Sequence, residues 1–259
     1  MKVTTKSSVK ASTEPSIKAL ILNSGQGSRM GNIKTCKCLV EVAEGKTIVD
    51  LQLRALLRCG INDICMTTGP YADRLESHLH KNYPEANFQF VNNPIYDKTN
   101  YIYSIYLARE NFQEHEDILM LHGDLLIEID HLKGQLAYPH SCMMIDSKLP
   151  LPPKDFKAVF SSDKKSDKIT AVGVDFFENA VYAQPLYKLL WKDWKIWLES
   201  ICRFCETGNT KVYAENAFNE VSDKMNLLPF DACGRLCFEV DNMDDLNYAK
   251  SVYISLIGA

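Results

Sequence analysis

The chain has 259 residues, of which 46% are hydrophobic and 24% are charged, and its net charge is −4. This length and composition are typical of a globular protein with one large α/β core or two smaller ones. The negative charge excludes the basic surface of a nucleic-acid-binding protein, and no apolar stretch reaches the roughly 20 residues needed for membrane insertion.

The first sixteen residues are rich in Ser, Thr and Lys, and no apolar run follows the lysines. We therefore expect residues 1–16 to form a disordered extension without a secretory signal, and residues 17–259 to form a single domain. Nine cysteines, an odd number spread along the chain, are typical of a reducing compartment. These features predict a cytoplasmic protein.

Short apolar segments alternate with amphipathic ones in the first half of the chain. The predicted strands cover residues 17–23, 64–68, 88–92 and 118–121, and the predicted helices cover residues 48–59, 72–81 and 101–111. This alternation predicts a parallel sheet with helices on both faces. Ligands bind beyond the carboxyl ends of such strands, so we expect Asn23, Gly69 and Asp124 to border one crevice.

After Pro139 the apolar segments become shorter and are broken by prolines and polar turns. Strands are predicted over residues 142–145, 156–160, 169–176, 181–184 and 236–240, and helices over residues 186–206, 214–221 and 243–257. The first four of these strands indicate a small antiparallel extension of the sheet. The whole chain therefore predicts an α/β protein with three layers, α/β/α, around a mixed, mainly parallel sheet.

A glycine-rich segment, Ser-Gly-Gln-Gly-Ser-Arg-Met-Gly, directly follows the first predicted strand. The backbone N–H groups around Gly25 and Gly27 are free to close on an oxyanion, and the cations Arg29 and Lys37 follow within twelve residues. This combination favours a bound nucleoside triphosphate. The alternative is a glycine-rich turn with surface cations.

Two better-known phosphate-binding motifs fail to match the sequence. A dinucleotide fingerprint needs its third glycine one position before Gly31. A P-loop ending in Gly45-Lys46-Thr47 needs a glycine where Val40 stands.

The remaining pattern, S-G-x-G-S-R-M-G followed by K-C-L-V, resembles the L-x-x-G-x-G-x-R-M…P-K-x-L-V signature of the sugar-nucleotide and cytidylyl transferase superfamily. In this chain Cys36 replaces the usual proline, and Asn23-Ser24 replace the usual pair of alanines. Residues 92–107 also resemble the N-x-x-Y-S-L-Y-L segment of phosphocholine cytidylyltransferase-like proteins. The resemblance covers residues 17–128 well and residues 210–250 loosely, and it implies a Rossmann-like nucleotidyltransferase fold.

The resemblance also implies roles for individual residues. Arg29 would bind the departing phosphates, Lys37 would bridge the α-phosphate and the nucleophile, and Lys157 would face the developing charge. The implied nucleotide-binding residues are Leu22, Asn23, Ser24, Gly25, Gln26, Gly27, Ser28, Gly69, Asn93 and Gly123. The acceptor-binding candidates are Asn100, Tyr101, Ser104, Glu215 and Asn219.

Two aspartates, Asp124 and Asp241, each follow a predicted strand, and the resemblance implies that they share a Mg²⁺ ion. Triphosphate chemistry independently favours a hard cation held by carboxylates. Asp241 has the alternative role of N-cap for the last predicted helix.

The leading hypothesis is a Mg²⁺-dependent cytidylyltransferase. Its partners would be CTP, or another NTP, and a small phosphorylated or phosphonate acceptor such as phosphocholine, 2-aminoethylphosphonate or phosphoglutamine. One alternative is a sugar 1-phosphate nucleotidyltransferase that uses UTP or another NTP. The alternative from another class is a non-catalytic nucleotide-binding protein with the same fold. The oligomeric state stays open, a homo-oligomer included.

Several reactive side chains have no role in this hypothesis. His122 beside Asp124 fits either a contact to substrate or metal, or a packed neutral histidine. The spacing of Cys202, Cys205, Cys233 and Cys237 is a loose match to a four-thiolate zinc site. Cys36 and Cys38 flank Lys37 and would react readily in an electropositive site.

Overall fold

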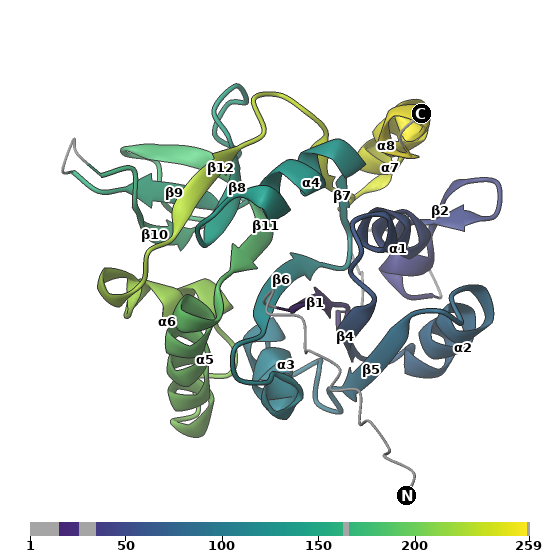
Figure 1. The fold of residues 1–259 in the computed structure, drawn as a ribbon, viewed down its shortest axis with the longest axis horizontal. Coiled ribbons are helices and arrows are strands. Elements are labelled where there is room, and N and C mark those ends of the chain that lie inside the picture. The colour runs from purple at the N-terminus through teal and green to yellow at the C-terminus, as the bar shows by residue number, and fades with distance from the viewer. Residues whose placement is uncertain (1–15, 26–34, 163–165, 258–259) are drawn as a thin grey trace, which may run out of the picture.

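The computed structural model of the chain describes residues 16–25, 35–162 and 166–257. The expected extension over residues 1–16 therefore lies outside the described residues except for Ser16, and the single-domain organisation stays a prediction. In the described part, nine strands form one sheet in the order β10-β9-β11-β6-β1-β4-β5, with β8 paired to β11 and β12 paired to β8 (Figure 1). The strands are β1 (Ile17–Leu22), β4 (Asp63–Thr68), β5 (Asn87–Asn92), β6 (Asp117–His122), β8 (Cys142–Asp146), β9 (Lys157–Phe160), β10 (Ile169–Gly173), β11 (Ala180–Leu189) and β12 (Leu228–Asp231).

The sheet is mixed, as predicted. Strands β5, β4, β1 and β6 are parallel, whereas β11 runs antiparallel to β6, β8 and β9. Two small antiparallel sheets accompany it, formed by β2 (Glu41–Ala43) with β3 (Lys46–Thr47) and by β7 (Leu125–Ile127) with β13 (Cys237–Glu239).

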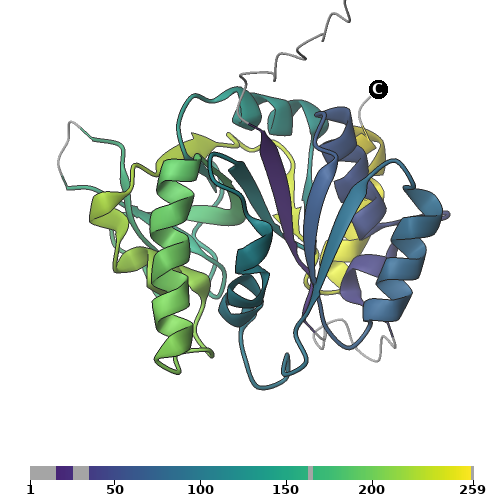
Figure 2. The ribbon, with the colours of Figure 1, turned by 60° about the horizontal axis from the view of Figure 1, so that its bottom comes forward.

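Helices cover both faces of the sheet, so the molecule has the predicted α/β/α layers (Figure 2). On one face, α3 (Tyr101–Ala108), α5 (Trp191–Glu206) and α6 (Ala214–Asn219) contribute to a large apolar cluster. On the other face, a second cluster contains residues of α1 (Ile48–Arg58), α2 (Ala72–Asn82) and α4 (Ile129–Ala137). Strand β1 is apolar on both sides because Leu20 enters the first cluster and Ile21 the second.

The last two helices, α7 (Met243–Ser251) and α8 (Tyr253–Ile257), return to the first half of the chain. They share an apolar cluster with Ile48 and Leu51 of α1, and Figure 1 shows them beside α1 and β2. Asn242 starts α7 with a capping box, in which its side chain accepts from the backbone N–H groups of Asp244 and Asp245. Asp241 is therefore not the N-cap but the residue directly before it.

The predicted helix over residues 186–206 begins too early. Residues 186–189 are the last part of β11, and α5 starts at Trp191. Leu186 and Tyr187 face opposite apolar clusters, so this segment is a strand that is buried on both faces and not the first turn of the helix. Strands β2, β3, β7 and β12 and helix α4 were not predicted from the sequence. The predicted helix over residues 101–111 ends as the 3₁₀ turn η3 (Arg109–Asn111).

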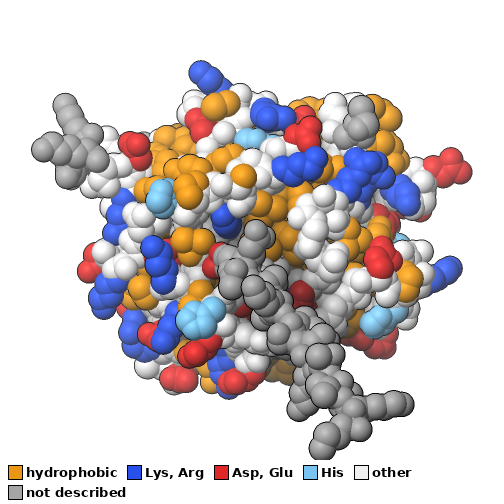
Figure 3. Space-filling model, viewed as in Figure 1, with side chains coloured by type: hydrophobic (Ala, Val, Ile, Leu, Met, Phe, Trp, Pro, Cys, Tyr) orange, Lys and Arg blue, Asp and Glu red, His pale blue; other side chains and the backbone are white. Residues whose placement is uncertain are grey.

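On the face shown in Figure 3, acidic and basic side chains are interspersed and do not gather in one basic patch. Within the described ranges, no helix combines the length and apolar character required to cross a bilayer.

Candidate active site

A cavity of about 290 Å³ lies at the carboxyl ends of β1 and β6. Its walls are formed by residues from both halves of the chain, namely Leu22, Ser24, Gly25, Asn93, Tyr96, Thr99, Asn100, Tyr101, His122, Asp124, Lys154, Asp155, Phe156, Val174, Tyr213, Glu239 and Asp241. Its position agrees with the expected crevice at the strand ends.

The amine of Lys37 lies between two carboxylates at this cavity. Its Nζ is 2.5 Å from Asp124 Oδ2 and 2.5 Å from Asp241 Oδ1. Lys37 starts the 3₁₀ turn η2 (Lys37–Leu39), and Asp124 lies between β6 and β7. Strand β13 pairs with β7, and the Val240 N–H donates to Asp124 O at 2.9 Å, which brings Asp241 to the same place. Three residues that are far apart in the sequence therefore meet in one site.

Lys37 and Asp124 each stabilise the charged form of the other. Burial opposes the charge of Lys37, but Asp124 and Asp241 outweigh burial and raise the pKa of the amine. Burial alone would raise the pKa of Asp124, but Lys37 and His122 outweigh burial and lower it. The lysine is therefore a fixed cation and Asp124 a fixed anion near neutral pH.

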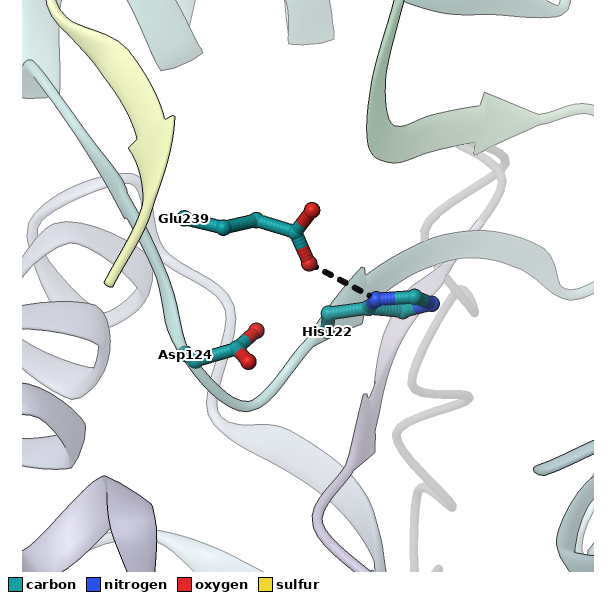
Figure 4. Close-up of side chains that lie close together, drawn as sticks. All are labelled: His122, Asp124 and Glu239. Carbon is teal, nitrogen blue, oxygen red and sulfur yellow. Dashed lines mark hydrogen bonds and ion pairs between the residues drawn. The ribbon is translucent and has the colours of Figure 1, made fainter. Parts of the chain in front are cut away.

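His122 and Glu239 form a second ionisable pair beside Asp124 (Figure 4). His122 Nδ1 is 2.9 Å from Glu239 Oε1, and one ligand atom of each of the three residues lies within 4.8 Å of the others. Burial and the charge of Asp124 raise the pKa of Glu239 to about 7. Burial opposes the charge of His122, but its hydrogen bond to Glu239 outweighs burial and raises its pKa. His122 thus faces the cavity as a paired side chain.

Sequence reasoning missed Glu239, although one signal could have found it. Glu239 and Asp241 are two residues apart at the end of a strand, so their side chains share one face. A carboxylate at this spacing from a candidate metal ligand is itself a candidate.

The predicted nucleotide-binding residues divide into three groups. Leu22, Ser24, Gly25 and Asn93 line the cavity. The strand ends lie close together at Asn23, Gly69 and Gly123. A Cβ on Gly69 would lie 2.3 Å from Ser24 O, and a Cβ on Gly123 would lie 1.6 Å from Asn23 Oδ1. The other predicted residues, Gln26, Gly27, Ser28 and the catalytic candidate Arg29, lie outside the described residues.

Lys157 is not among the residues that line the cavity, and its amine is bound to the backbone of Val174, which does line it. The Nζ donates to Val174 O at 2.5 Å and lies 4.1 Å from the ring centroid of Phe177. Its neighbours Asp155 and Phe156 line the cavity instead. The role expected of Lys157 therefore stays a prediction.

Of the acceptor candidates, Asn100 and Tyr101 line the cavity. Ser104 lies behind the wall, where its hydroxyl bonds Ser24 Oγ at 2.7 Å and accepts from Asn93 Nδ2 at 3.0 Å. Ser104 therefore positions cavity residues and does not line the cavity itself.

The remaining two candidates, Glu215 and Asn219, are also absent from this wall. Glu215 is buried and accepts hydrogen bonds from the hydroxyls of Tyr101 and Tyr187. Asn219 bonds the backbone N–H and C=O of Val172 in β10 at 2.8 and 2.9 Å. Both residues border a smaller adjoining pocket of about 150 Å³.

The four-cysteine zinc site is not formed. His122, Asp124 and Glu239 are the group with metal-ligand spacing within residues 16–25, 35–162 and 166–257, and all nine cysteines are free thiols. Of these, Cys36 and Cys38 have sulfur atoms 3.1 Å apart.

The carboxylates at Lys37 suit a hard divalent cation. Asp124 Oδ1 is buried and receives no hydrogen bond of ordinary geometry from the described residues, so one oxygen is left for a ligand. Oxygen donors of this kind are those that Mg²⁺ prefers. The residues present therefore fit a magnesium ion.

Three comparisons with known proteins bear on this site. A profile of the MobA-like NTP transferase domain matches residues 19–139. CTP:phosphoglutamine cytidylyltransferase of Campylobacter jejuni is 33% identical over 114 residues, which are 42% of this chain and 44% of that protein. CMP-5'-(3-aminopropyl)phosphonate synthase of Streptomyces rubellomurinus is 29% identical over 139 residues, which are 53% of this chain and 22% of that protein. The chain thus spans less than half the length of each of these two relatives.

The fold comparison extends over nearly the whole chain. A solved structure of CTP:phosphocholine cytidylyltransferase from Streptococcus pneumoniae has a TM-score of 0.71, covers 92% of this chain and 100% of its own, and is 20% identical. The two proteins share their fold, including the antiparallel half that lies beyond the matched residues 19–139.

Proposed function

We propose that the chain is a magnesium-dependent cytidylyltransferase of the nucleotidyltransferase superfamily, and the match of residues 19–139 to the MobA-like NTP transferase domain supports this proposal. It would join CTP to a small phosphorylated or phosphonate acceptor and release pyrophosphate. The observation that carries this proposal is the meeting of Lys37 with Asp124 and Asp241 at the cavity. The names of both sequence relatives refer to CTP or to a CMP product, which supports cytidine as the base.

The reaction needs positioning and charge neutralisation more than acid–base chemistry. An oxygen of the acceptor's phosphate or phosphonate attacks the α-phosphorus of CTP in line, the bond from that phosphorus to the bridging oxygen breaks, and pyrophosphate leaves. The acceptor oxygen is already ionised near neutral pH, so no general base is required. Lys37 would hold the α-phosphate against the incoming oxygen and neutralise charge in the transition state.

Asp124 and Asp241 would hold Mg²⁺, with Glu239 close enough to join them. The ion would supply charge neutralisation on the triphosphate. Arg29 on the departing phosphates and Lys157 on the developing charge remain predictions, the latter requiring its amine to leave Val174 O.

The cavity wall indicates how the acceptor would be held. Asn100 and Tyr101 are at its surface, and Glu215 fixes the Tyr101 hydroxyl from behind. We propose an acceptor of the phosphocholine, 2-aminoethylphosphonate or phosphoglutamine kind, located with the enzyme in the cytoplasm, where nine free thiols are stable.

The test is pyrophosphate release by the purified chain with Mg²⁺, each of the four NTPs, and a panel of phosphate and phosphonate acceptors. We expect release only with CTP and one acceptor class. Release only with a hexose 1-phosphate and another NTP would establish the sugar 1-phosphate alternative. Nucleotide binding without release from any acceptor would establish the non-catalytic one.

A matched pair of variants ties the activity to the site. Asp124→Asn should abolish turnover while the protein stays folded, whereas Asp130→Asn, at an exposed carboxylate paired with Lys133, should leave turnover unchanged. Near-normal turnover of Asp124→Asn would refute the assignment of Asp124.

A further inference from the structure

Two thiols flank the lysine at the centre of the site. The Sγ atoms of Cys36 and Cys38 are 3.1 Å apart, and the residue between them is Lys37. Cys36 is 4% exposed and Cys38 is fully buried in the apolar cluster beneath α1 and α2. Nothing in the proposed transfer reaction uses either sulfur.

We propose that Cys36 and Cys38 are a redox modification site, at which a small hydroperoxide converts the two thiols into a reversible disulfide that displaces Lys37. The proposed formation of the disulfide depends only on the two thiols, whereas its proposed effect on turnover depends on the cytidylyltransferase function proposed above.

The chemistry balances in two steps. The Cys36 sulfur attacks one oxygen of the hydroperoxide, the O–O bond breaks, and Cys36 becomes a sulfenic acid while water or an alcohol leaves. The Cys38 sulfur then attacks the Cys36 sulfur, which forms the S–S bond and releases water. Two thiols are oxidised by two electrons and one peroxide is reduced, and a dithiol reductant reverses the change.

The local contacts favour Cys36 as the first sulfur to react. The hydrogen bond from Cys38 lowers the pKa of the Cys36 thiol, whereas burial raises the pKa of Cys38. Cys36 also retains the only exposed surface of the pair. Cys38 lies within contact distance as the resolving thiol, so the second step needs no large movement.

The bond would change the position of Lys37. A disulfide holds its sulfur atoms about 2.05 Å apart, so the two thiols must approach by about 1 Å. The backbone of Lys37 is part of the ring that closes, and η2 is only three residues long. The amine would therefore leave the point where it is 2.5 Å from both carboxylates. A misplacement of about 1 Å in a catalytic group costs on the order of 100-fold in rate.

The experiment treats the full-length protein with hydrogen peroxide and measures four properties. These are the free-thiol count, the cysteine pairing by peptide mapping without reduction, the acylation of Lys37 by an amine reagent, and the turnover. We expect loss of two thiols, a Cys36–Cys38 bridge, faster acylation of Lys37, and a loss of turnover on the order of 100-fold that dithiothreitol restores.

Three variants provide controls. Cys36→Ser and Cys38→Ala should lose both the bridge and the dithiothreitol-reversible inhibition. Cys233→Ser, at an exposed thiol far from Lys37 in the sequence, should keep both. Where a core variant fails to fold, the cysteine pairing mapped in the peroxide-treated wild-type protein still decides the outcome.

Two results would overturn the inference. Oxidation confined to other cysteines would remove the modification site. A mapped Cys36–Cys38 bridge with unchanged Lys37 acylation and unchanged turnover would remove the displacement of Lys37. If the chain had no transferase activity, the bridge and the acylation would still test the site, so the two failures are distinguishable.

Discussion

At Lys37 a single amine neutralises two acidic side chains that would otherwise repel one another. Asp124 and Asp241 come from segments that are 117 positions apart (241 − 124), and each lies 2.5 Å from the same nitrogen. Their side chains are less than one-fifth exposed, so water screens this repulsion only in part. The lysine therefore has a structural effect on the site as well as its proposed catalytic one.

Lys37→Met keeps the length of the side chain and removes its charge. We expect turnover to fall on the order of 100-fold or more, because transition-state charge loses a fixed cation. Lys133→Met, at an exposed lysine paired with Asp130, should retain turnover. Initial rates of pyrophosphate release compare the two variants, and equal rates would show that Lys37 is not catalytic.

Glu215 is a buried carboxylate with two tyrosine donors. The Tyr187 hydroxyl donates at 2.7 Å, and Tyr101 donates to the other oxygen. Burial and the charge of Glu215 raise the pKa of both tyrosines, so both remain protonated donors. Tyr101 lines the cavity and Tyr187 does not. Loss of either hydroxyl should therefore affect stability, whereas only loss of the Tyr101 hydroxyl should also affect substrate binding.

Tyr101→Phe and Tyr187→Phe are a matched pair for this reason. Each should lower the free energy of unfolding by about 1–3 kcal/mol, since each leaves one oxygen of a buried carboxylate without its donor. Only Tyr101→Phe should also raise the KM for the acceptor. Urea unfolding and steady-state kinetics make the comparison, and an equal KM increase in Tyr187→Phe would contradict the assignment of the wall.

At the scale of elements, the carboxyl ends of β1, β4 and β6 approach closely because glycines follow two of them. A Cβ at Gly69 would lie 2.3 Å from the backbone oxygen of Ser24, which cannot rotate away. A Cβ at Gly25 would meet no atom of the described residues within 4 Å. The two glycines belong to the same cavity region but differ in the space around them.

Gly69→Ala should therefore destabilise the protein by about 2 kcal/mol or more, because Ser24 must shift together with β1. Gly25→Ala should cost no more than about 1 kcal/mol. Thermal and urea unfolding of both variants test this difference. A Gly69→Ala variant as stable as Gly25→Ala would mean that the strand ends have room to separate.

The sequence predicted the parallel half of the sheet well, since each of its strands is a continuous apolar run between turns. It failed where pairing partners decide the structure. Residues 186–189 extend β11 because β6 and β8 bond to them, and no local propensity reveals those partners. Strand β12 contains a proline and lies at a sheet edge, so its pattern is weak.

The residues of the site show the same contrast between what a local sequence pattern predicts and what depends on packing partners. Lys37, Asp124 and Asp241 were predictable because glycines, charges and strand ends mark them in the sequence. Ser104 and Asn219 do not line the cavity as predicted. A polar side chain on a short helix gives the same sequence pattern whether it faces a cavity or bonds a neighbouring strand. Their roles depend on packing against β1 and β10, which the sequence does not specify.

At the scale of the whole molecule, buried ionisable groups make the free energy of unfolding depend on pH. The pKa of Glu239 is raised to about 7, so ionising it weakens the folded state as pH rises from its ordinary pKa to that value. The raised pKa of His122 acts in the same direction, because its stabilising charge is lost as pH rises through the folded-state pKa. The lowered pKa of Asp124 has the opposite effect, because the stability that it contributes is lost as pH falls through its folded-state pKa in more acidic solution.

We therefore expect the urea midpoint to fall between about pH 5 and pH 8, and to fall less in Glu239→Gln. His122, Asp124 and Asp241 are the charged groups that face Glu239, and they stay in place in this variant. Glu110→Gln, at a side chain that is 82% exposed, should behave like the wild type. A steeper fall in Glu239→Gln than in the wild type would contradict this account.

The pairing of β7 with β13 has a consequence for synthesis on the ribosome. A nascent polypeptide could bring Lys37 to Asp124 once residue 124 has emerged, but the second acidic partner arrives only after residue 241. Translation must therefore pass residue 241 before the proposed triphosphate pocket can exist, and a product that stops earlier carries the glycine-rich motif without Asp241.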